Sequence, residues 1–547
     1  MASSATTEVP EKVIWQPAAG KLTAEPGSSP ASDERATSPS PDTAGMLKTE
    51  LKALARQSSH YLAALIGNLC LGFVSFPVYT RVLSVSEYGI MDLGQRLLLM
   101  LTIASKLGFQ NATLRFYNRN EFSKNPAERR KFFSTIFFGM LFTAVTVGVL
   151  FQITARVMPQ ALMLGPLANL VYLILGLALL RAMGSILWGF LRIEERTKTF
   201  STLQVSVKAV TLAAVCALFP LIGHFARVFF VAAVGVETVL VLGLTAWLLQ
   251  RDVLSPRCFD RSFFRTAMAF GAPLVAYEFS FAILGSADRF LVRHYVGPNA
   301  LGLYSVACGL ANNVNEFLVA PINLALVPIY MRIFTSDGPD KTAAFLRTAF
   351  DLFALAAIGL LAAVSAAGRS VLILLASSKY SGADQIIPLI LGGLLIWTSN
   401  VFFGAGLLIQ KKTLRMAGIL VVSAIANILL NCALLPKMGL MGGALATLLS
   451  YLICIIMLTR ASHRLLPLHI DLRAFGSYAI AGLIAWMAGT LIRIESPALN
   501  FLCRSSVVLT VYIALLYAVG GRVRTAADGA LQWLRSRREA AISHASF

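Results

Sequence analysis

From about residue 60 onward, long apolar runs alternate with short polar loops. A helix needs ~20 apolar residues to cross the hydrocarbon core of a bilayer, and the runs are close to that length. Hydrophobic residues make up 57% of the 547 residues and charged residues 14%, which is more apolar surface than one soluble core could bury. The sequence therefore predicts an all-α polytopic membrane protein with about fourteen transmembrane helices. The runs lie at approximately 61–80, 93–114, 132–155, 161–191, 203–223, 226–249, 268–288, 301–330, 345–367, 385–409, 414–435, 440–459, 474–492 and 503–521.

The cations in the loops predict the orientation of these spans. Loops on one side hold clusters of Lys and Arg, as at 129–131 and 192–198, whereas loops on the other side hold one or two cations each. Because cytoplasmic loops are enriched in Lys and Arg, we expect both termini in the cytoplasm. These loops also account for the formal net charge of +20. The charge therefore indicates attraction to anionic membrane lipids rather than a nucleic-acid partner.

The two ends of the chain differ from the spans. Residues 1–45 are rich in Ser, Pro, Ala, Thr and Glu, which predicts a disordered cytoplasmic segment that is not a signal peptide. Residues 522–547 are basic, and apolar residues recur there at helical spacing, for example at Ala527, Leu531 and Leu534. We expect an amphipathic helix on the inner leaflet, with a plain basic tail as the alternative.

The chain also matches itself. The matches are Gly89 with Gly302 and "LRFYNR" (114–119) with "VPIYMR" (327–332) at an offset of 213 residues, and "CALFPLIG" (216–223) with "CALLPKMG" (432–439) at an offset of 216. Six spans separate the copies, so the copies run the same way across the membrane and are parallel repeats. We expect two six-helix lobes, at 46–250 and 251–465, followed by two further spans at 466–521.

Four segments resemble a known family. They are "FPVYTRVLSVSEYG" (76–89), "GSADRFLVRHYVGPNALGLYSVACGLAN" (285–312), "KYSGADQIIPLILGGLLI" (379–396) and "NILLNCALLPKMGLMGGALATLLSYL" (427–452). They are similar to the polysaccharide transporter family. This family is the O-antigen and exopolysaccharide flippase branch of the multidrug/oligosaccharidyl-lipid/polysaccharide (MOP) exporter superfamily. The resemblance covers about residues 55–465, and so spans both lobes.

The resemblance implies a fourteen-helix transporter of the bacterial cytoplasmic membrane that works by alternating access. Its cargo would be an oligosaccharide linked to undecaprenyl pyrophosphate, and polysaccharide polymerase or assembly proteins would be partners. Three alternatives stay open. They are a flippase for lipid II, the peptidoglycan precursor; a cation-coupled exporter of small molecules from the same superfamily; and a membrane scaffold that transports nothing.

The sequence shows no motif for an enzyme or a cofactor. No GxSxG, P-loop or phosphate-binding glycine fingerprint stands in a suitable strand–helix context. The seven cysteines are scattered, without a CxxC or a Cys/His cluster. We therefore expect no catalytic residue, no cofactor and no metal, and a driving force from an ion gradient or from substrate flux.

Three cations lie inside apolar runs. Lys106, Arg181 and Lys208 all fall in the first lobe, where placing a charge in hydrocarbon costs at least ~2.5–3.5 kcal/mol. One interpretation is that the side chains extend to the membrane surface and bind nothing, which suits Lys208 better than the other two. The alternative is a basic cavity wall that binds an anionic lipid headgroup.

Carboxylates and amides also lie inside apolar runs. Glu237, Glu278 and Glu316 are mid-span and are candidate sites for ion coupling. Asn312 lies four residues before Glu316, so the two share a helix face. We expect this face to line a cavity, with hydrogen bonds between helices as the alternative.

Asp288 and Arg289 close the apolar run at 268–288. The repeat places Ser75 and Phe76 at the equivalent positions, so the ionic pair belongs to the second lobe alone. We expect structural pairing or a gate at the outer mouth, with direct substrate contact as the alternative.

Overall fold

The structure is a computed structural model that describes residues 41–117, 125–158, 165–194, 196–468 and 470–519. The chain divides into two units, Met1–Arg56 and Gln57–Phe547. Of the first unit the structure describes only the beginning of α1, a helix that starts at Pro41. The rest of the predicted disordered segment and the predicted amphipathic helix at 522–547 lie outside the described residues.

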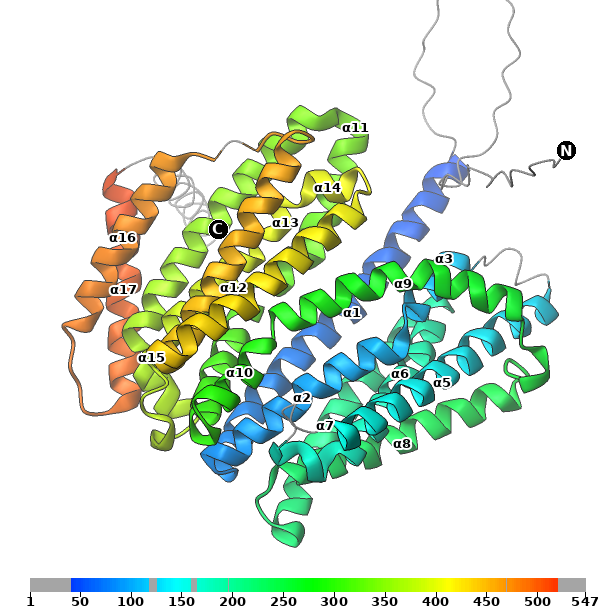
Figure 1. Ribbon diagram of the computed structural model, residues 1–547. Coiled ribbons are helices and arrows are strands. Elements are labelled where there is room, and N and C mark those ends of the chain that lie inside the picture. Colours follow the sequence, from blue (N-terminus) through cyan, green and yellow to red (C-terminus); the bar gives the residue numbers. More distant parts are fainter. Residues whose placement is uncertain (1–40, 118–124, 159–164, 195, 469, 520–547) are drawn as a thin grey trace, which may run out of the picture. The chain divides into compact units, whose positions relative to one another are not determined.

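All regular elements within the described ranges are helices (Figure 1), which confirms the all-α fold. The α-helices are α1 (Pro41–Val82), α2 (Val85–Lys106), α3 (Phe109–Phe116), α5 (Pro126–Val157), α6 (Val171–Ile193), α7 (Thr197–Ile222), α8 (Ala226–Gln250), α9 (Arg261–Leu284), α10 (Ala287–Tyr295), α11 (Pro298–Leu375), α12 (Ile387–Thr398), α13 (Asn400–Phe403), α14 (Ala405–Ile409), α15 (Thr413–His463), α16 (Leu472–Thr490) and α17 (Pro497–Val519). Short 3-10 helices are η1 (Gly165–Leu170), η2 (Pro256–Cys258) and η3 (Ser378–Tyr380).

Ten helices of the described part are long and apolar enough to cross a membrane, which confirms a polytopic membrane protein. The two longest helices are interrupted at glycines. Gly338 in α11 (φ +85°) and Gly439 in α15 (φ +57°) have non-helical backbone angles, and each lies between two of the apolar runs seen in the sequence. The count of fourteen spans stays a prediction.

Helix α2 contacts both halves of the second unit, the first half up to residue 250 and the second half from residue 251. It packs against α5, α6 and α8 of the first half and against α9 and α11 of the second half. Its start is fixed by Ser84, whose hydroxyl accepts a hydrogen bond from the Glu87 amide at 3.2 Å, as an N-cap residue does. α16 and α17 pack against each other and against α11.

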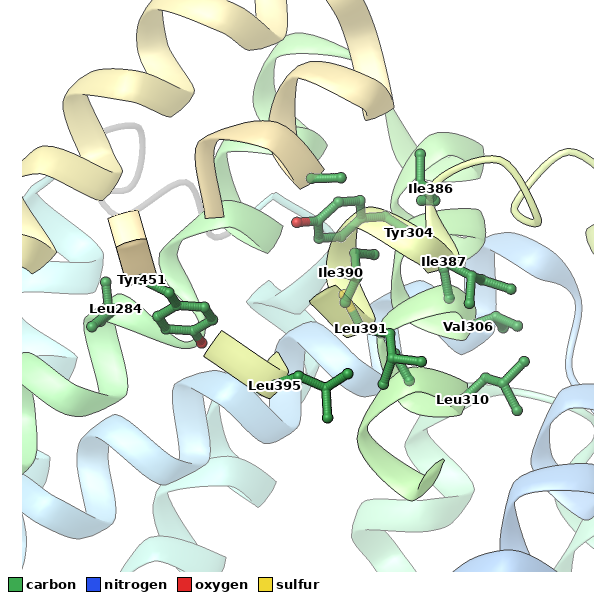
Figure 2. Close-up of a cluster of buried hydrophobic side chains, with 14 of the residues drawn as sticks. Leu284, Tyr304, Val306, Leu310, Ile386, Ile387, Ile390, Leu391, Leu395 and Tyr451 are labelled. Atoms are coloured by element: carbon green, nitrogen blue, oxygen red, sulfur yellow. The ribbon is translucent and has the colours of Figure 1, made fainter. Parts of the chain in front are cut away.

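Helix α9 is part of the second half in sequence but packs against helices of both halves. Near its start, Ala267 is part of a hydrophobic cluster with α3, α5, α6 and α8, whereas Leu284 at its end is part of the main core. The packing of α9 therefore spans both predicted lobes, and the lobe boundary at residue 251 stays a prediction. Figure 2 shows the main core, where Ile387, Ile390, Leu391 and Leu395 of α12 pack near Leu310 of α11.

Two glycines allow α2 and α11 to touch. A Cβ atom added to Gly89 would lie 2.8 Å from the backbone nitrogen of Gly302, and one added to Gly302 would overlap the carbonyl oxygen of Val85. Only glycine permits such a close approach of two backbones. Gly89 and Gly302 are matching positions at the offset of 213 residues, so equivalent residues of the two halves contact each other.

Candidate functional site

A cavity of about 640 Å³ lies among α1, α2, α3, α6, α7 and α8. Among the described residues, the cations that line it are Lys106, Arg181, Arg192 and Lys208, and the carboxylate in its wall is that of Glu237. We call it the basic cavity. The three cations singled out in the sequence thus lie together, with a formal excess of three positive charges over the wall as a whole.

Lys106 reaches the basic cavity because α2 ends at this residue. The next two residues, Leu107 (φ +41°) and Gly108 (φ +74°), have left-handed backbone conformations that terminate the helix. The Lys106 ammonium donates a hydrogen bond to Gln110 Oε1 on α3 at 3.1 Å. An amide oxygen positions the ammonium without neutralising its charge.

Arg181 and Glu237 form an ion pair across the basic cavity wall. Arg181 Nε on α6 lies 3.0 Å from Glu237 Oε1 on α8, and 39% of the Arg181 side chain is exposed. The carboxylate therefore fixes the guanidinium on one edge and leaves much of it open to the cavity. A single bond of this kind leaves other N–H donors of the guanidinium available.

Lys208 and Arg192 complete the cationic wall. The Lys208 ammonium on α7 donates a hydrogen bond to the Asn68 carbonyl oxygen of α1 at 2.7 Å. Arg192, in the last turn of α6, stacks on the Phe200 ring with 4.6 Å between its Cζ atom and the ring centre. Neither residue has an acidic partner among the described ion pairs.

A second cavity, of about 300 Å³, lies among α2, α9, α10, α11, α12, α13 and α15. The predicted face of α11 lines it through Asn312 and Glu316, together with Asn315 and with Asn400 of α13. We call it the amide cavity. Its charged residues balance, because Arg96 and Arg289 face Asp288 and Glu316.

The two cavities are built from matching positions of the two halves. The first residue of each matching pair lines the basic cavity, and the second, 213 positions later, lines the amide cavity. On α2 and α11 the pairs are Gln95 and Cys308, Leu99 and Asn312, Thr102 and Asn315, and Lys106 and Val319. On α6 and α12–α13 they are Arg181 and Leu394, Gly184 and Trp397, Ser185 and Thr398, and Trp188 and Val401. This is the arrangement expected of parallel repeats.

Asp288 and Arg289 do not close the helix of the seventh span. α9 ends at Leu284, the chain turns at Gly285 and Ser286, and the pair lies on α10. The predicted run at 268–288 includes Gly285 and Ser286, which is why the sequence predicts one helix there. Arg289 Nη1 donates to the Gly285 carbonyl oxygen at 2.8 Å, a bond that satisfies an end carbonyl of α9.

Buried ionic groups surround this pair. Arg289, with 4% of its side chain exposed, lies 2.8 Å from Asp288 and 3.2 Å from Asp92 of α2. Asp92 also binds Arg96 at 3.0 Å, and the Tyr304 hydroxyl donates to Asp288 at 2.7 Å. The network therefore joins α2 to α10 and α11. Its direct contacts are those of structural pairing, and a role as an outer gate stays a prediction.

The three candidate coupling carboxylates lie apart. Glu237 is paired in the basic cavity, Glu316 lines the amide cavity, and Glu278 of α9 accepts a hydrogen bond from Asn111 of α3 at 3.1 Å. Within the described ranges no group of three or more His, Cys, Asp or Glu residues could hold a metal ion. The structure thus brings the predicted cations together but not the predicted acids.

The sequence prediction omitted Asp92, Arg96 and Arg192 as site residues. The run at 93–114 begins just after Asp92, and Arg192 follows the end of the run at 161–191, so both resemble loop charges. Arg96, however, lies inside an apolar run at four residues from Asp92. Oppositely charged residues four positions apart on a membrane helix indicate a polar site inside the membrane.

Comparison with solved structures identifies the fold. The lipid II flippase MurJ in an inward closed conformation is similar with a TM-score of 0.65 and 13% identity, over 85% of this chain and 98% of that one. An inward-facing multidrug resistance MATE family transporter of the MOP superfamily has a TM-score of 0.54 and 13% identity, over 73% of this chain and 94% of that one. The protein is thus a polytopic membrane protein that shares the fold of these two transporters.

The family follows from sequence. The family model described as polysaccharide biosynthesis protein matches residues 54–334, slightly more than half of the chain, and the chain belongs to this family. An uncharacterized membrane protein of Methanocaldococcus jannaschii is 25% identical over 198 residues, which are 36% of this chain and 38% of that protein. The match to this relative therefore covers well under half of its length.

Proposed function

We propose that the protein is a flippase that moves an undecaprenyl-pyrophosphate-linked oligosaccharide across the bacterial cytoplasmic membrane for exopolysaccharide or O-antigen synthesis. Both termini would lie in the cytoplasm. The observation that supports this most is the basic cavity, in which four cations face one carboxylate inside an apolar helical bundle. Membership of a polysaccharide biosynthesis family supports the same cargo.

The cavity suits the headgroup of such a lipid. A pyrophosphate that links a lipid to a sugar carries two negative charges, and charge-assisted hydrogen bonds to Arg and Lys are strong where water is scarce. Lys106 and Lys208 bind neutral oxygen atoms, so their charges are free to bind an anion. The edge of the Arg181 guanidinium that does not bind Glu237 can donate hydrogen bonds to the same anion.

Alternating access requires contacts between the halves that can break. One group lies at the α1–α2 turn, where Arg81 donates to the Leu374 carbonyl oxygen at 2.6 Å and Lys379 donates to that of Leu83 at 2.6 Å. Another group joins α3 to α9 through Asn111 and Glu278. In the proposed cycle these two groups of contacts form and break in turn.

A lipid II flippase is the second candidate, favoured by the fold likeness to MurJ over nearly all of that chain. Its cargo bears the same pyrophosphate, so the basic cavity suits both lipids. The likeness to MATE transporters gives a cation-coupled exporter as a further alternative, which the excess of cations disfavours for a cationic cargo.

Reconstitution of the full chain into proteoliposomes tests the proposal. We expect translocation of a fluorescent undecaprenyl-pyrophosphate-linked oligosaccharide that exceeds that of lipid II, and no accumulation of a cationic dye. Faster translocation of lipid II would favour the second candidate. Dye transport without lipid translocation would contradict both flippase functions.

A further inference from the structure

The amide cavity adjoins the basic cavity. Leu99 of α2 lines both cavities, and 40% of this apolar side chain is exposed. One helical turn earlier, Gln95 lines the basic cavity and its neighbour Arg96 lines the amide cavity. A ligand bound in the basic cavity therefore has a second cavity immediately across α2.

The wall of the amide cavity presents a row of aromatic rings. Trp397 of α12 lies between Phe281 of α9 and Tyr451 of α15, with ring centres 5.4 Å and 5.5 Å away and interplanar angles of 37° and 36°. All three residues line the cavity. Such a surface binds a flat apolar face, which a pyranose ring presents through its C–H groups.

The polar atoms that are open to the amide cavity include acceptors without a partner. Asn312 and Asn400 each use one side-chain N–H group on the carbonyl oxygens of Cys308 and Trp397, both at 2.8 Å. Their side-chain oxygens, and the carboxylate of the exposed Glu316, have no hydrogen-bond partner in the described part of the chain. Acceptors placed this way match a ligand that is rich in O–H donors.

The charged groups of the amide cavity exclude a phosphate there. Arg289 and Arg96 are bound to Asp288 and Asp92, which leaves the Glu316 carboxylate to repel an anion. The volume of about 300 Å³ is at the lower end of small-molecule sites, which span ~300–1,000 Å³. The space, the rings and the acceptors together suit a sugar.

We propose that the amide cavity is a sugar subsite that binds the first residues of the glycan while the basic cavity binds the pyrophosphate. Stacking on Trp397 and hydrogen bonds to Asn312, Asn400 and Glu316 would select the glycan. The inference rests on the proposed function, since it takes the basic cavity as the pyrophosphate site. It adds that the two parts of one cargo bind in different halves of the chain.

Binding to the full chain in nanodiscs tests the subsite. The probes are undecaprenyl pyrophosphate and the same lipid bearing galactose, glucose or N-acetylglucosamine. We expect at least one sugar-bearing lipid to bind wild type more tightly than the bare lipid. Trp397→Ala and Asn312→Leu should each weaken that lipid about tenfold, the loss of ~1.4 kcal/mol, and leave the bare lipid unchanged.

Controls separate this inference from the proposed function. Phe142→Ala removes an aromatic ring that is 65% exposed on α5 and should change neither affinity. Loss of bare-lipid binding in Lys106→Ala tests the basic cavity alone. Equal binding of bare and sugar-bearing lipids to wild type would overturn the sugar subsite, as would equal weakening of both by Trp397→Ala.

Glu316→Gln distinguishes a sugar from an ion. The amide keeps an acceptor oxygen, so the preference for the sugar-bearing lipid should fall by less than in Trp397→Ala, and it should not depend on Na⁺ or pH. A Na⁺- or pH-dependent change in transport with no change in sugar preference would identify an ion-coupling site and contradict the proposal.

Discussion

At positions 106 and 181 the basic cavity has cations, whereas the amide cavity has Val319 and Leu394 at the matching positions. At two other pairs the functional groups are in the amide cavity, where Asn312 and Trp397 match Leu99 and Gly184 of the basic cavity. The helices that form the two walls correspond, but their side chains have different chemistry. The halves therefore share a scaffold and differ in what they can bind, which is the basis of the following predictions.

The largest effect should follow from removing the cations of the basic cavity. Lys106→Ala with Arg181→Ala should reduce transport to background, because the pyrophosphate loses its charged partners, while the amount of protein in the membrane stays unchanged. Complementation of a flippase-null strain measures this. Lys198→Ala, at an exposed position at the start of α7, is the matched control. Transport that persists with both cations replaced would contradict the basic-cavity mechanism.

Replacing the arginine of one cavity should destabilise the protein more than replacing that of the other. Arg289 is 4% exposed and holds two carboxylates, whereas Arg181 is 39% exposed. Arg289→Ala leaves the buried Asp288 carboxylate without a cation, while Asp92 keeps Arg96, and should cost ~3–5 kcal/mol, against less than ~1 kcal/mol for Arg181→Ala. Thermal unfolding of the purified variants measures both. Equal losses would show that the Arg289 network does not stabilise the fold.

A smaller loss is expected at the contact between the halves. Gly302→Ala places a methyl group against the Val85 carbonyl oxygen and should destabilise the protein by ~1–3 kcal/mol. Gly148→Ala on α5, where nothing lies within 4 Å of the added atom, should be neutral or stabilising by ~0.5–1 kcal/mol. The comparison uses thermal unfolding, and similar midpoints for the two variants would argue against a close contact of α2 and α11.

The smallest effect should come from a surface group outside both cavities. Asp260 caps α9 by accepting hydrogen bonds from the Ser262 and Phe263 amides, and it lies 3.0 Å from Lys131. The hydrogen bond from Lys131 and those backbone amides lower the pKa of Asp260. The pair therefore stabilises the fold above the unfolded pKa of ~3.9, and this stabilisation is lost as pH falls through the folded pKa.

Two variants of Asp260 separate the cap from the ion pair. Asp260→Asn should keep the cap and abolish the acid-dependent part of the stabilisation. Asp260→Ala should also lose the cap, at a cost of ~1 kcal/mol. Unfolding midpoints of both variants from neutral pH down to about pH 2 measure this, because the loss falls below the unfolded pKa, and identical pH profiles for wild type and Asp260→Asn would count against the ion pair.

Much of the fold could be predicted because the bilayer limits the choice of structure. Apolar runs near the length of a membrane helix indicate the fold class without any tertiary information. The repeat in the sequence indicates matching positions, and the two cavities lie at such positions. The separate helix α10 was not predicted, because Gly285 and Ser286, which form the turn before it, are small residues that also occur inside membrane helices.

The site could be predicted in part. Lys106, Arg181 and Lys208 are conspicuous because each interrupts an apolar run, and a buried cation requires a polar environment. Their partners are not conspicuous, since the pair of Arg181 and Glu237 joins residues that are 56 positions apart. The network of Asp92, Arg96 and Arg289 depends in the same way on which helices meet.

The contact between Gly89 and Gly302 also bears on how such a chain can evolve. In a symmetric dimer a residue on the twofold axis meets its own copy, and any substitution there occurs twice at once. Within one chain the two glycines can mutate separately, yet a side chain at position 89 would meet the Gly302 backbone and one at position 302 would meet the Val85 carbonyl oxygen. Both positions are therefore restricted to glycine, while the cavity positions a few turns along the same helices have acquired different chemistry.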